Sequence, residues 1–264
     1  MADKPLPPIL DHDPGEATVF HPANLIEASR QQKNLPPCRV PEGCLLDFDG
    51  ELLEALVSTG RAMHDPGWPC FHTRLYRWKT GRNEYGVIGG TIGAPFAVLV
   101  AEELFSCGCQ ALVSLGSAGL ISQDLQPPFF LLIERSLRDE GTSYHYLPAA
   151  PFAAADQEAL NRVQAGLDNA GITLVRAATW TTDAPFRETP TRIDFCRSQA
   201  IAAVEMEAAA LLAFASATKR KVVCLSQVTN RMAQGPKDFD KGGQGGLESA
   251  IRLCEAALRA LLAA

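Results

Sequence analysis

The segment YGVIGGTIGAPFAVLVAEELFSCGCQALVSL, residues 85–115, alternates between two kinds of secondary structure. Residues 85–89 form a short apolar run that predicts a buried strand, and residues 110–115 predict a second strand followed by a glycine. Between them, residues 95–105 open with a proline and have the length and apolar content of a helix. A strand, a helix and a strand in this order predict an α/β unit.

The same alternation continues towards the carboxyl end. We expect strands at residues 129–133, 172–178 and 222–226, and helices at residues 154–170, 206–218 and 247–262. Short apolar strands that alternate with helices are typical of a sheet covered on both faces. Residues 1–45 are rich in proline and polar side chains, so we expect an N-terminal extended arm there and a single domain over residues 46–264.

Composition excludes several classes of protein. The chain has 264 residues, 47% of them hydrophobic, with a net charge of -6 and a pI near 5.4, which argues against a nucleic-acid-binding protein. No apolar run reaches the roughly 18 residues of a membrane span, and the N-terminus lacks the apolar region of a signal peptide. We therefore expect a cytoplasmic protein. The eight cysteines and five histidines do not have the spacing of a metal site, so no metal is predicted.

The run Val204-Glu205-Met206-Glu207 places two carboxylates inside an apolar stretch at the start of a small-residue helix. A carboxylate in an apolar site is costly unless it has a polar partner, so one interpretation is a ligand site. Two acceptor groups at this spacing suit the adjacent hydroxyls of a sugar. The other interpretation is structural, with Glu205 capping the helix and Glu207 exposed in its first turn.

Four loops at predicted strand ends carry polar or glycine-rich sequences. In residues 89–93 the glycines would let backbone N–H groups approach an anion at a helix start, although a tight turn explains them equally well. Residues 116–119 (GSAG) also contain glycines after a predicted strand, and residues 138–144 (RDEGTSY) combine charged and hydroxyl side chains with a glycine. In residues 181–189, Phe186 is an aromatic side chain suited to stacking on a base. Taken singly, each loop is explained by structure alone.

Taken in order, these stretches resemble the nucleoside phosphorylase family, which includes uridine phosphorylase, bacterial purine nucleoside phosphorylase and the nucleosidases. The resemblance runs from about residue 84 to residue 262 and is closest to uridine phosphorylase. The matching stretches are GTIGAP at 90–95, AEEL at 101–104, LGSAGLI at 115–121, R-x-EGTS at 138–143, TD at 182–183, VEME at 204–207 and VTNR at 228–231.

The resemblance implies a three-layer α/β/α fold around a central mixed, twisted sheet. It also implies cleavage of a nucleoside N-glycosidic bond by phosphate, without a cofactor, to give a base and a (deoxy)ribose 1-phosphate. The sugar passes through an oxocarbenium-like transition state that a nearby anion stabilises. Family members assemble as dimers, trimers or hexamers, so we expect a homo-oligomer.

Residue roles follow from the same resemblance. Glu207 would bind the ribose hydroxyls, with Met206 packed on the sugar and Glu205 beside it. Ser117 would contact phosphate and ribose. The base would lie among Ala118, Gly119, Phe186, Arg187 and Glu188.

Asn230 and Arg231 indicate the class of base. Purine-specific members carry an aspartate at the position of Asn230, which protonates the leaving base, whereas uridine phosphorylases have Asn-Arg as in this chain. An asparagine cannot act as a general acid, so a pyrimidine nucleoside is favoured. Asn230 is also compatible with a plain turn after the strand.

The chain departs from the family at the phosphate site. The family motif Gly-Asp-Pro-x-Arg corresponds to residues 48–52, where Phe48 replaces the glycine and Leu52 the arginine. A second arginine is replaced by Ser114, and Asp47, Asp49 and Glu51 would repel a dianion. Compensation would come from Arg74, Arg77 or Arg82, and we assign Ser117, Ser114 and Arg74 to phosphate.

Two further segments and two further functions stay open. His21 resembles an N-terminal residue that reaches the ribose 5′-hydroxyl in a partner's site, or it is a surface histidine on the arm. Residues 234–246 are a lid over the base or a linker. The missing arginines favour, as alternatives to a phosphorylase, a phosphate-independent nucleoside hydrolase or a non-catalytic nucleoside-binding protein.

Overall fold

The computed structural model describes residues 6–37, 39–230 and 243–263. Its strands are β1 (Gly43–Asp47), β2 (Ala62–His64), β3 (Tyr76–Thr80), β4 (Asn83–Gly89), β5 (Ala111–Leu120), β6 (Phe129–Asp139), β7 (Phe152–Ala154), β8 (Val175–Thr182), β9 (Ile201–Glu205) and β10 (Lys221–Asn230). Its α-helices are α1 (Pro22–Gln32), α2 (Glu51–Ser58), α3 (Ala94–Ser106), α4 (Gln157–Asn169), α5 (Pro190–Ser198), α6 (Ala208–Thr218) and α7 (Gly243–Leu262). Short 3₁₀ turns are η1 (Pro8–Leu10), η2 (Thr142–His145) and η3 (Pro185–Arg187).

The strands form one mixed sheet in the order β10-β6-β8-β9-β5-β1-β4-β3-β2. The centre is parallel, because β1 pairs in parallel with both β4 and β5. β10 also pairs in parallel with β5 while it pairs antiparallel with β6, so five strands, β10, β6, β8, β9 and β5, close on one another. The central mixed sheet expected from the resemblance is confirmed.

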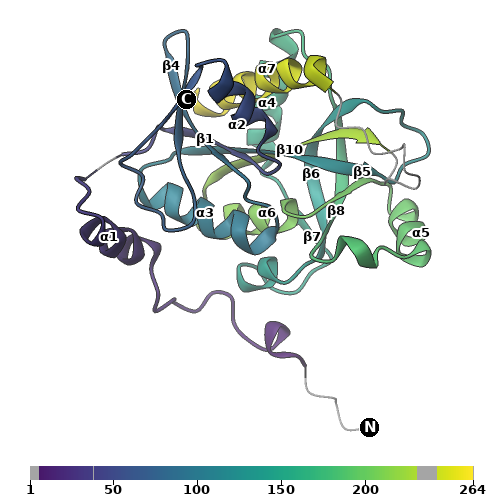
Figure 1. The fold of residues 1–264 in the computed structure, drawn as a ribbon. Coiled ribbons are helices and arrows are strands. Elements are labelled where there is room, and N and C mark those ends of the chain that lie inside the picture. The colour runs from purple at the N-terminus through teal and green to yellow at the C-terminus, as the bar shows by residue number, and fades with distance from the viewer. Residues whose placement is uncertain (1–5, 38, 231–242, 264) are drawn as a thin grey trace.

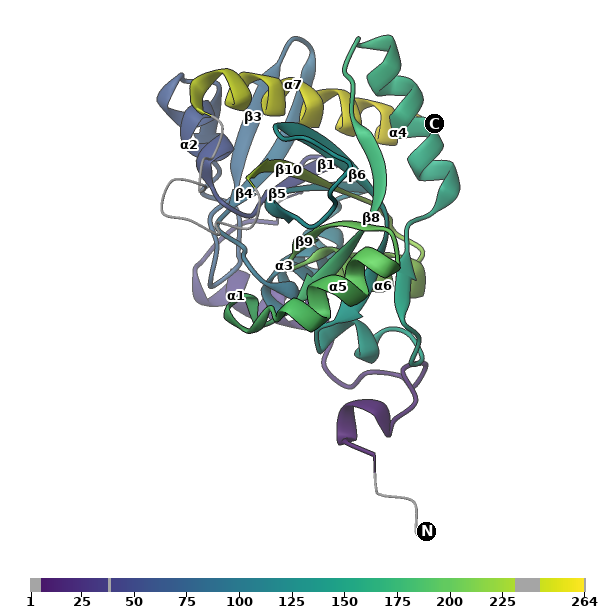
Figure 2. The ribbon, with the colours of Figure 1, turned by 90° about the vertical axis from the view of Figure 1, so that its right-hand side faces the viewer.

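Helices cover both faces of the sheet. Figures 1 and 2 show α2, α4 and α7 on one side, and α3, α5 and α6 on the other. The main core is continuous through these layers and includes Leu45 of β1, Leu112 of β5 and Phe214 of α6, each at most 1% exposed. No helix in the described ranges is long and apolar enough to cross a membrane.

The N-terminal segment differs from the extended arm that we expected, because it contains α1. A proline opens this helix, and its buried residues are Ile26 and Ser29. The hydroxyl of Ser29 donates to the carbonyl of Pro69, and the ammonium of Lys33 donates to the same carbonyl at 2.7 Å. The helix packs against α3, as Figure 1 shows. Prolines alone therefore did not distinguish an extended arm from a helix that begins at a proline.

Candidate active site

A cavity of about 500 Å³ opens where β5, β9 and the loops after β1 and β4 meet. Parallel strands bring their carboxyl ends to one edge, and this edge is where ligands bind in open α/β sheets. The side chains and backbone that line the cavity belong to Phe48, Asp49, Ile92, Gly116, Ser117, Ala118, Gly119, Pro185, Phe186, Glu188, Val204, Glu205, Met206 and Glu207.

Glu205 holds the start of α6. One carboxylate oxygen accepts from the backbone N–H groups of Glu207 and Ala208 at 2.7 and 2.6 Å. The other accepts from the hydroxyl of Thr181 at 2.5 Å, with Thr179 and Ser136 at 3.1 and 3.2 Å. Burial raises the pKa of Glu205, and these donors oppose the shift. Glu205 therefore serves the helix terminus, as the structural interpretation of the Glu-Met-Glu run expected.

The same interpretation expected Glu207 to be exposed in the first helical turn, and this part is wrong. Glu207 is 4% exposed and lies in the cavity wall. Its carboxylate accepts from the backbone N–H of Gly93 at 2.7 Å and from that of Met206 at 3.2 Å. Burial and then the charge of Glu205 raise the pKa of Glu207 to about 8. The glycine loop before α3 thus binds a carboxyl group of the protein itself, with Gly93 at φ +94°.

Ser117 is bound by Asp49. The backbone N–H of Ser117 donates to one carboxylate oxygen of Asp49 at 2.8 Å, and its hydroxyl donates to the other at 3.3 Å. A backbone N–H beside a hydroxyl is a donor pair suited to an anion. In this structure the anion is the side chain of Asp49.

A smaller cavity of about 40 Å³ adjoins the first through Asp49, Gly116 and Ser117. Its wall also carries the carboxylates of Asp47 and Glu51. Asp47 is 3% exposed and accepts from the backbone N–H of Leu53 at 2.8 Å. Burial raises the pKa of Asp47 to about 6, and the charge of Asp49 adds to the shift. Among the described residues that line either cavity, none is a lysine or an arginine.

Phe48 lines the larger cavity and packs against Gly116. Its backbone N–H donates to the carbonyl of Leu115 at 2.9 Å, and the side chain is 5% exposed. A Cβ built on Gly116 would lie 2.7 Å from the Phe48 ring. A side chain at position 116 would therefore clash with Phe48, so Phe48 requires the glycine at that position.

The sequence-predicted site residues separate into two groups. Those that line the cavity are Ser117, Ala118, Gly119, Phe186, Glu188, Glu205, Met206 and Glu207. Arg187 lies in η3 but is exposed and outside the lining. Ser114 is buried at 1% in β5, level with Cys224, also outside the lining. Arg74 is exposed in the loop before β3, and His21 is the exposed N-cap of α1.

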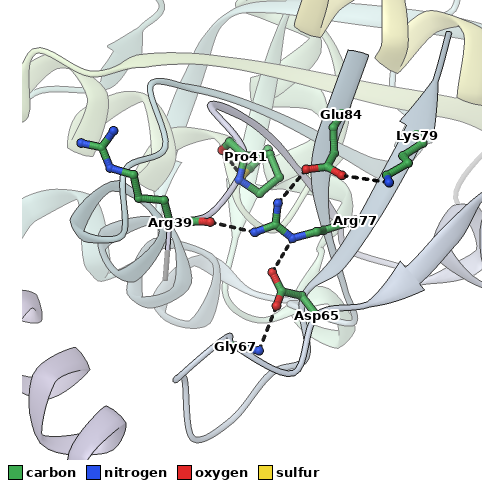
Figure 3. Close-up of polar contacts among 8 residues, drawn as sticks. Arg39, Pro41, Asp65, Gly67, Arg77, Lys79 and Glu84 are labelled. Atoms are coloured by element: carbon green, nitrogen blue, oxygen red, sulfur yellow. Dashed lines mark hydrogen bonds and ion pairs between the residues drawn. The ribbon is translucent and has the colours of Figure 1, made fainter. Parts of the chain in front are cut away.

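Arg77 is engaged elsewhere. Figure 3 shows its guanidinium between Asp65 and Glu84, at 2.7 and 2.6 Å, with a third contact to the carbonyl of Arg39 at 2.8 Å. These partners fix Arg77 on the face of β3. Within this chain, therefore, the structure does not bring the proposed compensating arginines Arg74 and Arg77 to the cavity.

The carboxyl end of β10 reaches the same edge of the sheet, where the backbone of Asn230 pairs with Gly119. The side chain of Asn230 and all of Arg231 lie outside the described residues, as does most of the segment 234–246.

Sequence reasoning missed Ile92 and Val204 as cavity residues and took Asp49 only as a repulsive charge. Ile92 is 55% exposed beside the cavity, and Phe186 is 99% exposed. Exposed apolar side chains at a concave site indicate ligand or partner contact. The matching stretches contained both Ile92 and Val204, but no feature of these sequences indicated that the two residues line a cavity. No group of three potential metal ligands occurs in the described part of the chain.

The chain is similar to known proteins in sequence and in fold. Residues 43–262 match the family model described as "Phosphorylase superfamily". The chain is 23% identical to a guanosine phosphorylase of Halorubrum lacusprofundi over 64% of this chain and 73% of that protein. It is 27% identical to a uridine phosphorylase of Thermococcus kodakarensis over 66% and 68%.

Among solved structures, a purine nucleoside phosphorylase from Toxoplasma gondii in complex with immucillin-H superposes with a TM-score of 0.72. It shares 16% sequence identity and covers 84% of this chain and 90% of that one. At this identity the likeness establishes the fold.

Proposed function

The chain belongs to the phosphorylase superfamily, and we propose that it cleaves the N-glycosidic bond of a pyrimidine nucleoside with inorganic phosphate as acceptor. Nucleoside phosphorylases of this family are pentosyltransferases that take phosphate as co-substrate and need no cofactor. The proposed products are the free base and a (deoxy)ribose 1-phosphate. We also propose that the protein works as a homo-oligomer.

The observation that carries the proposal is Glu207 in the cavity wall. Its carboxylate is oriented by the N–H of Gly93 and buried away from bulk water. An oxocarbenium-like sugar develops positive charge in the transition state, and the ionised form of Glu207, which prevails above its pKa of about 8, stabilises that charge where the dielectric is low. Glu207 is also an acceptor for ribose hydroxyls, with Met206 beside it in the lining.

The pyrimidine assignment rests on Asn230 and on the base end of the cavity. An asparagine does not supply the general acid that a purine leaving group requires. Phe186 and Glu188 at the cavity mouth offer a stacking surface and a hydrogen-bond acceptor for a base. The similar proteins include one that acts on guanosine and one that acts on uridine, so the identity of the base has to be measured.

The test is a product analysis with uridine, thymidine, inosine and adenosine, each with and without phosphate. We expect phosphate-dependent release of uracil or thymine together with a sugar 1-phosphate. Glu207→Gln should lower kcat/KM by roughly 100-fold or more, the usual effect of losing one preorganised electrostatic contact. Glu54→Gln, which alters an exposed carboxylate of α2, serves as the control. Full turnover by folded Glu207→Gln would rule out this role.

A second candidate, hydrolysis with water as acceptor, is favoured by one observation. Three carboxylates, Asp47, Asp49 and Glu51, line the smaller cavity where the acceptor would enter. Such a surface repels a phosphate dianion and accepts hydrogen bonds from water. Free ribose released at the same rate with and without phosphate would establish this alternative. Ribose 1-phosphate as the sole sugar product would exclude it.

A further inference from the structure

We propose that Asp49 is a built-in competitor for the acceptor phosphate: its carboxylate occupies the anion-binding donors of Ser117, and phosphate binds only by displacing it. The inference rests on the proposed function, because it concerns the acceptor of that same site. It assigns to Asp49 control of phosphate affinity.

The first argument is the geometry of the contact. Both carboxylate oxygens of Asp49 face Ser117, one at the backbone N–H and one at the hydroxyl, at 2.8 and 3.3 Å. Two adjacent oxygens of a phosphate present the same pair of acceptors. Each of these donors carries one hydrogen, so a carboxylate and a phosphate cannot both take up this pair in full.

The second argument is the position of this contact. Asp49, Gly116 and Ser117 line both cavities and therefore stand at their junction. The charge of Asp49 reaches Glu207, whose pKa it raises in addition to the larger effects of burial and Glu205. An anion held on Ser117 therefore lies next to the groups that we assign to the sugar.

The third argument is that Asp49 is free to leave. Its side-chain hydrogen bonds within the described residues are both to Ser117, and the residue is half-buried. Asp47, by contrast, is buried and accepts the N–H of Leu53. Outward rotation of Asp49 would uncover the donor pair and carry the carboxylate towards solvent, where its charge is hydrated.

The experiment measures inorganic phosphate binding by calorimetry in wild type, Asp49→Asn and the control Glu54→Gln. Asp49→Asn keeps the size of the side chain and removes its charge. Glu54→Gln removes one charge from an exposed position of the neighbouring helix, outside both linings. We expect Asp49→Asn to lower the Kd for phosphate about tenfold or more, because a like charge at hydrogen-bonding distance is removed. The control should stay within about twofold, since exposed charges are screened.

Asp49→Ser provides a second variant, with a shorter neutral side chain, in case Asp49→Asn does not fold. Equal phosphate affinities in wild type and the Asp49 variants, or no phosphate binding in any of them, would overturn the inference. Nucleoside cleavage is measured on the same preparations. Tighter phosphate binding without cleavage of any nucleoside would reject the proposed function and leave this inference standing. Phosphate-dependent cleavage with the same Kd for phosphate in wild type and the Asp49 variants would support the proposed function and overturn this inference.

Discussion

The proton on Glu207 links the stability of this protein to pH. Burial, with the charge of Glu205 second, raises the pKa of this carboxyl from 4.5 to about 8. Between these values the native state holds a proton that the unfolded chain has released. The free energy of unfolding therefore falls as pH rises through this window. We expect wild type to lose about 3 kcal/mol relative to Glu207→Gln between about pH 5 and about pH 8.

Urea denaturation of both proteins across this pH range measures the difference. The exposed Glu158→Gln on α4 serves as the matched control and should follow wild type. If wild type and Glu207→Gln lose stability in parallel, the carboxyl of Glu207 titrates normally. The pH dependence that remains in Glu207→Gln reports on the other carboxyls whose pKa burial raises, among them Glu205 and Asp47.

At the scale of single residues, the sequence alone identified polar residues of the site but not the residues that they contact. The Glu-Met-Glu run indicated a buried polar site, and both carboxylates do line the cavity. It did not indicate that Glu205 is bound by hydroxyls from β6 and β8, with Ser136 lying 69 residues away in sequence. Asp49 and Ser117 are likewise 68 residues apart. No spacing rule relates such positions, because only the pairing of β1 with β5 brings them together.

At the scale of secondary-structure elements, the contact between α4 and α7 depends on a glycine. A Cβ on Gly166 would lie 2.5 Å from the Cβ of Ala260, closer than the two helices allow. We expect Gly166→Ala to lower the free energy of unfolding by about 1–3 kcal/mol through overpacking, despite its better helix propensity. Thermal or urea denaturation of wild type and Gly166→Ala measures the change in the free energy of unfolding.

The double variant Gly166→Ala with Ala260→Gly removes the clash by moving the methyl group to the other helix. It should recover most of the loss beyond the separate cost of Ala260→Gly, a coupling that a double-mutant cycle isolates. Additive effects in that cycle would show that the two positions do not contact each other.

Element prediction succeeded where the hydrophobic pattern was long and continuous. The strand, helix and strand expected within residues 85–115 correspond to β4, α3 and the first half of β5. The short strands β2, at the edge of the sheet, and β3 beside it were not predicted, because β2 has only 3 residues and β3 has no continuous apolar run. β9 and the helix before it were missed, since Ala202 and Ala203 fit a helix as well as a strand. Their places come from pairing with β5 and β8.

At the scale of the whole molecule, the N-terminal segment has two parts that contribute differently to the stability of the fold. Residues 6–20 include no buried side chain, although they line a cavity of about 840 Å³ against α3 and η2. The helix α1 buries Ile26 and Ser29 and ties the loop before β3 through Ser29 and Lys33. Most stabilisation by this segment should therefore come from α1.

Two truncations test this division. Removal of residues 1–20 should change the free energy of unfolding by less than about 1 kcal/mol, because few apolar contacts are lost. Removal of residues 1–35 should cost about 2–4 kcal/mol, since it uncovers part of α3 and takes away the partners of Pro69. Denaturation of the three chains at several protein concentrations compares them and reveals any change of assembly. A large loss on removing only residues 1–20 would instead assign the stabilising contact to the first part, either within the chain or in a second copy.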